Sequence, residues 1–250
     1  MTGYRAFLVK ELREVVATWR LYVLPVTLLV CAVASPLLAK ATPYLVSTVA
    51  NLPLTLPDPT VADAYAQWTK NLGQVALLVV IVSFSSAVNG ERSSGTAAMA
   101  LSKGLTPAAF IAAKVTAAVG LVVVGTALAT VVMALTTQAV FGDASWVRLF
   151  AATGAWVVLA LWSVTVVILL STALESASAT AGLGIAAWVV LSILSAWGPA
   201  ARWSPAGLLG APTALAAGTE TSWAWPLATG IVTAALFVVA TVLVMRRREL

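Results

Sequence analysis

Six runs of mostly apolar residues follow one another along the chain, and each is close to the length that a membrane-spanning helix needs. A helix crosses the hydrocarbon core of a bilayer in about 20 residues. No soluble-looking block separates the runs, so the pattern predicts an all-α integral membrane protein with one domain over residues 1–250. The runs lie at about 21–40, 70–90, 110–138, 146–174, 179–199 and 223–245.

The segment before the first run has a two-sided pattern at helical period. One face carries apolar side chains, namely Tyr4, Leu8, Leu12, Val15, Val16 and Trp19. The opposite face carries Lys10, Arg13 and Glu14. This pattern predicts that residues 1–20 form an amphipathic interfacial helix, the alternative being a solvated basic tail. The basic region is too long for a cleaved signal peptide.

Two connections between the runs contain helix signals of their own. Asp58-Pro59-Thr60 is typical of a helix start and leads into the second span. Between the fifth and sixth runs, Pro205 and Pro212 flank the apolar piece 207–211. That piece is too short to cross a bilayer, so we expect short outer helices there, either re-entrant or interfacial.

Charge indicates the orientation. The chain is 61% hydrophobic and 9% charged, with a net charge of +5. The basic residues cluster at the ends of the runs, which favours an orientation signal over nucleic-acid binding. With both termini on one side, ten basic residues share that side: Arg5, Lys10, Arg13, Arg20, Arg92, Lys103, Lys114, Arg246, Arg247 and Arg248. Four lie opposite: Lys40, Lys70, Arg148 and Arg202. The bias predicts a multi-pass protein of the inner membrane with both termini cytoplasmic.

Tryptophan supports the same orientation. Six tryptophans fall near the expected outer ends of the spans, where an aromatic belt lies in membrane proteins. They are Trp68, Trp146, Trp197, Trp203, Trp223 and Trp225.

The stretch Asn89–Lys114 is a charged, glycine-punctuated insert between the second and third spans. Ser93 and Ser94 can cap a helix start, and Ala97 to Ser102 have good helix propensity. Gly104 suits the left-handed position after that helix, and Thr106-Pro107 suits the start of the next. The insert therefore predicts a short helix on the membrane surface, although an ordinary capped loop would have similar signals.

The insert resembles a known family. Glu91-Arg92, Gly95-Thr96, Leu101-Ser102-Lys103, Phe110 and Lys114 are similar to the motif of permease subunits of type-2 ABC exporters. The layout of interfacial helix, six spans and short outer helices is similar as well. The sequence departs from the pattern at Gly104, where proline is common, and at Pro107, where arginine is common.

The resemblance implies that residues 91–107 form a cytoplasmic coupling segment that docks on a separate ABC ATPase subunit. The implied interface comprises Glu91, Arg92, Ser94, Gly95, Thr96, Met99, Leu101 and Lys103. It also implies a second permease copy, as a homodimer or a close heterodimer. ATP and magnesium would bind the partner ATPase and not this chain. The implied function is export of an apolar or amphipathic substrate from the cytoplasm or the inner leaflet.

The sequence offers little catalytic chemistry. It has no histidine, its one cysteine is Cys31, and it has no glycine-rich phosphate loop ending in Gly-Lys-Ser or Gly-Lys-Thr. We therefore expect no enzyme activity, no cofactor, no metal and no nucleic-acid partner on this chain.

Polar and aromatic residues within the spans are candidates for a substrate pathway. They are Gln74, Ser83, Ser86, Asn89, Thr126, Thr130, Trp156 and Trp188. Hydroxyls that bond to their own helix, and tryptophans that fill the core, would explain the same pattern. Two other functions stay open, a membrane anchor that docks a partner without transport and an ion-coupled secondary carrier. No charge falls near the middle of an expected span, which argues against the carrier.

Overall fold

The computed structural model describes residues 2–18, 20–50, 57–219 and 223–247, and every regular element in these ranges is helical. Six helices or helix runs are long and apolar enough to cross a membrane. They are Tyr22–Val46, Val61–Ser93, Pro107–Phe141, Trp146–Ala173, Ala177–Ser195 and Ala224–Arg247. The number and order of the expected spans are therefore confirmed. Trp19 and Arg248 lie outside the described residues.

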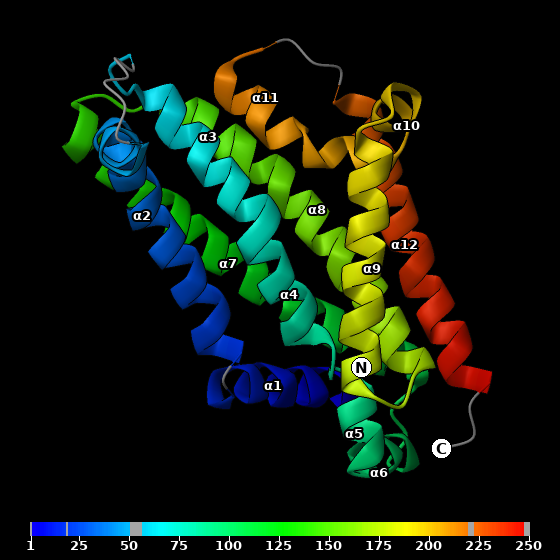
Figure 1. Ribbon diagram of the computed structural model, residues 1–250. Helices are drawn as coiled ribbons and strands as arrows, with labels where there is room; N and C mark the ends of the chain where they lie inside the picture. The colour runs from blue at the N-terminus through cyan, green and yellow to red at the C-terminus, as the bar shows by residue number, and fades with distance from the viewer. Residues whose placement is uncertain (1, 19, 51–56, 220–222, 248–250) are drawn as a thin grey trace.

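The elements carry the labels of Figure 1. The long ones are α2 (Arg20–Ala50), α7 (Pro107–Phe141), α8 (Trp146–Ala173), α9 (Ala177–Ser195) and α12 (Ala224–Arg247). The second span is built from α3 (Val61–Asn71), the π-helix η1 (Leu72–Ala76) and α4 (Leu77–Phe84), and is followed by α5 (Asn89–Ser93). The short ones are α1 (Thr2–Ala17), α6 (Thr96–Ser102), α10 (Gly198–Trp203), the 3-10 helix η2 (Pro205–Leu209) and α11 (Ala211–Ala217).

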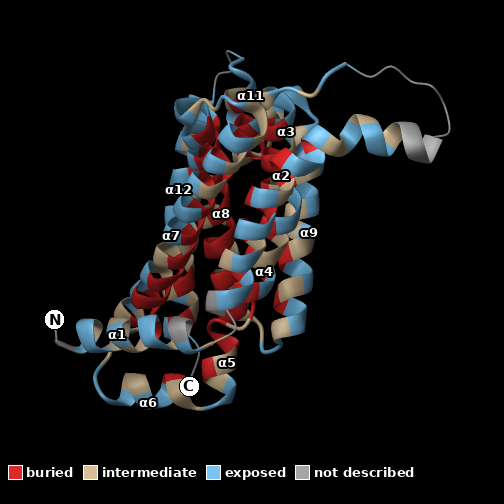
Figure 2. Cartoon of the chain, turned by 90° about the vertical axis from the view of Figure 1, so that its left-hand side faces the viewer, coloured by how far each residue is buried: buried red, intermediate tan, exposed pale blue. Residues whose placement is uncertain are grey.

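Short helices close the two ends of the bundle. At one end α1 lies across the long helices beside α5 and α6, and the C-terminal end of α12 is at the same end of the bundle (Figure 1). At the other end lie α10 and α11 (Figure 1). Buried residues follow the helix faces that point into the bundle (Figure 2). The first helix, the insert and the end of the last span therefore share one end of the molecule.

The second span begins earlier than its apolar run indicated. Its first helix starts at Val61, directly after Thr60, whose backbone N–H donates to the Asp63 carboxylate over 2.8 Å. The Thr60 hydroxyl donates to the same oxygen. This arrangement caps the helix start and confirms the signal in Asp58-Pro59-Thr60. Hydropathy missed residues 61–69 because polar side chains such as Asp63 and Gln67 lower the hydropathy of α3.

Two tryptophans fill the bundle core and bind polar partners there. Trp68 is fully buried and donates from Nε1 to the Thr153 hydroxyl over 3.1 Å. Trp156 is fully buried and donates to the Leu72 carbonyl over 2.8 Å. The placement of Trp68 in an aromatic belt was therefore wrong, because its ring packs between spans. The other five belt tryptophans are exposed, namely Trp146, Trp197, Trp203, Trp223 and Trp225.

The connection between the fifth and sixth spans packs on the end of the bundle and does not cross it. Leu208 in η2 is fully buried. It lies so close to α12 that a Cβ added at Gly230 would come within 2.7 Å of its Cδ1. The expected short helices between these spans are therefore present as α10, η2 and α11.

Candidate functional site

The insert between the second and third spans folds into two short helices, α5 and α6, that meet at Gly95. Gly95 has φ +74°, in the left-handed region that glycine adopts without steric cost. The prediction that Ser93 or Ser94 caps the start of α6 is wrong. Ser93 donates to the Gly90 carbonyl and Ser94 to the Glu91 carbonyl, and the N-cap residue of α6 is Gly95, which has no side chain to cap it.

The far end of the insert folds as its sequence predicts. Gly104 has φ +86° and ends α6 in the left-handed conformation. The Thr106 hydroxyl accepts from the Ala109 backbone N–H over 3.2 Å, and Pro107 is the first residue of α7. The departures at Gly104 and Pro107 from the resembled motif thus occupy positions that suit these two residue types.

A buried cluster of charged side chains joins the insert to α1 and α7. Lys114 on α7 lies 3.1 Å from both carboxylate oxygens of Glu11 and 3.1 Å from Oε1 of Glu91. Lys10 pairs with Glu11 at 3.2 Å, with Glu14 at 2.7 Å and also with Glu91. Glu11, Glu91 and Lys114 are each at least 94% buried. Three elements that are far apart in sequence are therefore held by one set of ion pairs.

Aromatic rings line the cluster. Phe7 on α1 stacks on Phe110 of α7 with ring centroids 5.0 Å apart. The Lys114 ammonium lies 5.0 Å from the centre of the Phe110 ring and 5.9 Å from that of Phe7. The rings exclude water and attract the cation through their negative faces, which strengthens the ion pairs around Lys114.

Burial and neighbouring charges shift two of the ionisable groups. Burial raises the pKa of Glu11, and the nearby Glu91 raises it further, against the lowering effect of Lys114 and Lys10. Burial lowers the pKa of Lys10, but hydrogen bonds to Glu14 and Glu91 outweigh it, so this pKa is raised. The carboxyl of Glu11 is therefore the member of the cluster that protonates more easily than an exposed glutamate.

The acidic side chains of the cluster could offer ligands to a metal ion. Carboxylate oxygens of Glu11, Glu14 and Glu91 lie within 4.8 Å of one another, which suits a hard divalent cation. The Lys10 ammonium, however, pairs with all three carboxylates. The Lys10 ammonium therefore occupies the position that a metal ion would take. A cavity of about 390 Å³ lies beside it, lined by Lys10, Glu14, Ser86, Gly90, Glu91, Ser94 and Thr96.

Polar contacts also fix α5 to the two spans that follow α7. The Ser171 hydroxyl of α8 accepts from the backbone N–H groups of Val88 and Asn89 over 3.0 and 3.2 Å. The Asn89 side chain donates to the Thr180 hydroxyl of α9 over 3.1 Å. Arg92 donates to the Thr172 carbonyl near the C-terminal end of α8 over 3.3 Å. Together with Glu91, these contacts connect α5 to α1, α7, α8 and α9.

The eight residues of the expected coupling interface differ in how exposed they are. Glu91 is buried in the charge cluster, and Arg92 is half-buried against α8. Ser94 and Lys103 are exposed, and the Met99 side chain is 57% exposed. Gly95, Thr96 and Leu101 are intermediate. Only α6 and its flanks are therefore available to a partner, while the acidic-basic pair faces the protein itself.

The expected pathway residues of the second span have different environments. Gln74 is exposed on η1, whereas Ser83 is buried on α4 and its hydroxyl has no hydrogen-bond partner among the described residues. Ser86 is half-buried and lines the cavity beside Glu91. Asn89 is buried, and within the same described part of the chain its Oδ1 has no partner. These four side chains do not share one cavity among those described.

The remaining pathway residues pack mainly within the bundle. Thr130 donates to the Thr126 carbonyl within α7, whereas the buried Thr126 hydroxyl has no partner in the part of the chain that the structure describes. Trp156 is a core residue. Trp188 lines a cavity of about 10 Å³, which is about the volume that one water molecule needs. The structure therefore does not bring the eight residues together at one place.

Sequence reasoning missed the charge cluster, although a signal was present. Leu8, Glu11, Leu12 and Val15 have the i, i+3, i+4, i+7 spacing of one helix face, so Glu11 interrupts an apolar stripe. Lys114 likewise interrupts the apolar start of the third span. A carboxylate and an ammonium that both occupy apolar faces indicate a buried pair.

The fold and its apolar spans define an all-helical integral membrane protein. Residues 17–250 match the family described as "Protein of unknown function (DUF2705)", and the chain belongs to this family. It is also 26% identical over 210 residues to the "Uncharacterized transmembrane protein YxlG" of Bacillus subtilis (strain 168). That similarity covers 80% of each chain.

Proposed function

We propose that this chain is the transmembrane permease subunit of an ATP-driven ABC exporter. The energy comes from a separate ATPase subunit, which binds ATP and magnesium and docks on α6. The substrate is apolar or amphipathic and leaves the cytoplasm or the inner leaflet. Both termini and the insert are on the cytoplasmic side of the inner membrane, in keeping with the ten basic residues at that end.

The observation that carries the proposal is the attachment of the insert. The α6 helix exposes Met99 and Lys103, while the adjoining α5 is bound to α1, α7, α8 and α9 through buried polar contacts. A push on α6 would therefore reach three spans at once, as a rigid lever does. A solvated loop without such contacts would absorb the movement.

The proposal includes a second copy of the permease, for which the outer faces of α9 and α12 are available. Large apolar side chains are exposed along both helices, among them Leu183, Val190 and Ile193 on α9 and Val232, Leu236 and Val239 on α12. These faces require a lipid or protein neighbour, because exposing them to water is unfavourable. A homodimer or close heterodimer would enclose a shared pathway between two such subunits.

The proposal is tested by co-expressing the chain with its candidate ABC ATPase and reconstituting the two in vesicles. We expect vanadate-sensitive ATP hydrolysis that rises when the permease is present. Lys103→Glu and Met99→Glu on α6 should lower this stimulation at least several-fold. Arg202→Glu, a charge reversal at the opposite end of the bundle, should not change it.

Two results would contradict the proposal. If neither α6 variant changes the stimulation of ATP hydrolysis, the insert does not have the proposed coupling role. Binding of an ATPase without substrate efflux would identify a membrane anchor, since the exposed side chains of α6 could dock a partner without coupling it to transport.

A further inference from the structure

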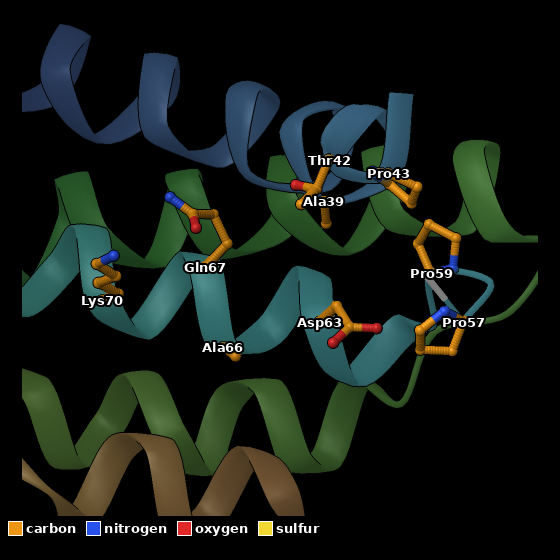
Figure 3. Close-up of a pocket in the computed structure, with 9 residues that line it drawn as sticks. All are labelled: Ala39, Thr42, Pro43, Pro57, Pro59, Asp63, Ala66, Gln67 and Lys70. Carbon is orange, nitrogen blue, oxygen red and sulfur yellow. The ribbon is translucent and has the colours of Figure 1, made fainter. Parts of the chain in front are cut away.

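A second cavity lies at the end of the bundle opposite α1, between α2 and α3 (Figure 3). Its volume is about 390 Å³. The lining combines one carboxylate, one ammonium, one amide and one hydroxyl with small apolar groups. It comprises Ala39, Thr42, Pro43, Pro57, Pro59, Asp63, Ala66, Gln67 and Lys70.

The polar groups of α3 lie along one stripe. Asp63, Ala66, Gln67 and Lys70 have the i, i+3, i+4, i+7 spacing of a single helix face. Seven residues separate the two charges, which corresponds to about 10 Å along the helix axis. The cavity therefore offers a negative and a positive group at different depths, with the Gln67 amide between them.

Both charged groups can receive a ligand. Lys70 is exposed and forms no hydrogen bond or ion pair within the described part of the chain. The Asp63 carboxylate accepts from Thr60 through Oδ2, so its Oδ1 can still accept a hydrogen bond. By contrast, Lys40 at the same end of the bundle already donates to the Val140 carbonyl over 2.9 Å.

The cavity is expected at the depth of lipid headgroups, because the polar α3 directly precedes the apolar part of the second span. From Val61 to Phe84 this span has 24 residues (11, 5 and 8 in α3, η1 and α4) and is about 36 Å long, whereas the hydrocarbon core is about 30 Å thick. The apolar residues begin at Leu72, so the part that extends beyond the hydrocarbon core at this end belongs to α3. In α2, the exposed Leu37 and Leu38 lie one turn nearer the bilayer centre than Thr42 and provide an apolar surface for acyl chains.

We propose that this cavity binds the headgroup of a zwitterionic, amine-bearing phospholipid. Lys70 binds the phosphate, and Asp63 binds the ammonium. The order of the charges fits, since Lys70 is nearer the bilayer centre than Asp63, and the phosphate of such a lipid is nearer its acyl chains than the amine. The Gln67 amide donates one N–H to Asn71 and can donate the other to a phosphate oxygen, whereas the Thr42 hydroxyl already donates to the Leu38 carbonyl over 2.7 Å. This site is independent of the proposed transport function.

The test is native mass spectrometry of the purified full chain in detergent, titrated with phosphatidylethanolamine. Phosphatidylglycerol has the phosphate without the amine, and free phosphoethanolamine has both charges without acyl chains. We expect phosphatidylethanolamine to bind most tightly. Lys70→Gln should lower the affinity for phosphatidylethanolamine and for phosphatidylglycerol about tenfold, because it removes a charge-assisted hydrogen bond to the phosphate. Asp63→Asn should lower the affinity for phosphatidylethanolamine alone. The helix cap is kept in this variant, because the amide oxygen of the new side chain can still accept from Thr60.

Matched variants separate binding from folding. Lys70→Arg keeps the charge and should keep the affinity, and Arg202→Gln removes a different cation at the same end and should not change it. Equal binding to the original chain and to Lys70→Gln would overturn the proposal, as would a preference for phosphatidylglycerol. If free phosphoethanolamine binds as tightly as phosphatidylethanolamine, the ligand need not be a lipid. The proposal that the site binds a phosphate and an amine together would then stand, and the proposal of a lipid would be overturned.

Discussion

Lys114 is the residue on which the buried charge cluster depends. It is 5% exposed, it contacts both Glu11 and Glu91, and it lies over the rings of Phe7 and Phe110. In such a dry environment the desolvation of each charge is costly, and the ion pair compensates only while both partners are present. Removing one charged partner should therefore lower the free energy of unfolding more than removing both members of a pair.

Lys114→Met should destabilise the protein by about 3–5 kcal/mol, because the buried carboxylates of Glu11 and Glu91 lose their buried cation and keep only the more exposed Lys10. Thermal unfolding in detergent measures the loss. Lys103→Met on the exposed end of α6 is the matched control and should have little effect. Adding Glu11→Gln to Lys114→Met should recover part of the stability. A Lys114→Met protein as stable as the control would show that the cluster contributes little.

Stability should also depend on pH through Glu11. Its pKa is raised in the folded protein, chiefly by burial, whereas the unfolded chain has the ordinary value of 4.5. The folded state thus binds the proton more tightly, so this contribution is full below pH 4.5 and is lost as pH rises through the raised pKa. Unfolding temperatures across this range should fall more steeply for the original chain than for Glu11→Gln. Parallel curves would contradict the assignment.

At this scale the sequence predicted the residues whose conformation is local. Gly104, Thr106 and Pro107 adopt the expected left-handed, capping and first-turn positions, because each depends on neighbours within a few residues. The partners of Lys10 and Lys114 could not be predicted in the same way. Their contacts join positions about 80 and 100 residues apart, and no local rule specifies such pairs.

Among the elements, α5 depends on other parts of the protein more than any other helix of the insert. It has five residues, too few to be stable alone, and its first N–H groups are satisfied by the Ser171 side chain of α8. This dependence explains why the sequence predicted α6 and missed α5. Its helical conformation follows from tertiary contacts and not from the propensity of Asn-Gly-Glu-Arg-Ser.

Ser171→Ala should loosen α5 without unfolding the bundle. Two buried backbone donors, at Val88 and Asn89, would lose their acceptor, at a cost of about 1–3 kcal/mol. Hydrogen exchange of the amides at 88–93 should become faster. Ser102→Ala is the matched control, since its hydroxyl donates only to the Met99 carbonyl within α6. Unchanged exchange at 88–93 would show that α5 is held by its other contacts.

The long helices were predictable as elements, with one informative exception. Apolar length alone identified six spans, but the second span is joined from α3, η1 and α4. Its π-helix coincides with the bond from Trp156 to the Leu72 carbonyl, a contact with α8 that hydropathy does not register. The depth of burial of Trp68 was missed for the same reason, because it depends on Thr153 of another span.

For the whole molecule, topology follows from the number of spans. Six crossings return the chain to its starting end, so α1, the insert and the end of α12 lie together, and α10 and α11 lie opposite (Figure 1). Which end faces the cytoplasm is a separate matter that the fold does not determine. The distribution of lysine and arginine predicts that it is the end with α1 and α6.

Labelling of single cysteines tests this orientation. The natural Cys31 is buried and can be replaced by serine to give a background without reactive thiols. In that background Ser102→Cys places a thiol on α6, and Asp143→Cys places one between α7 and α8 at the other end. A membrane-impermeant maleimide added to intact spheroplasts should label Asp143→Cys at once and Ser102→Cys only after lysis, because the lysine and arginine bias of the sequence predicts that the α6 end is cytoplasmic.

The reverse pattern would invert the topology and place α6 out of reach of a cytoplasmic ATPase. Labelling of both thiols before lysis would contradict a fold whose two ends lie on opposite sides of the membrane.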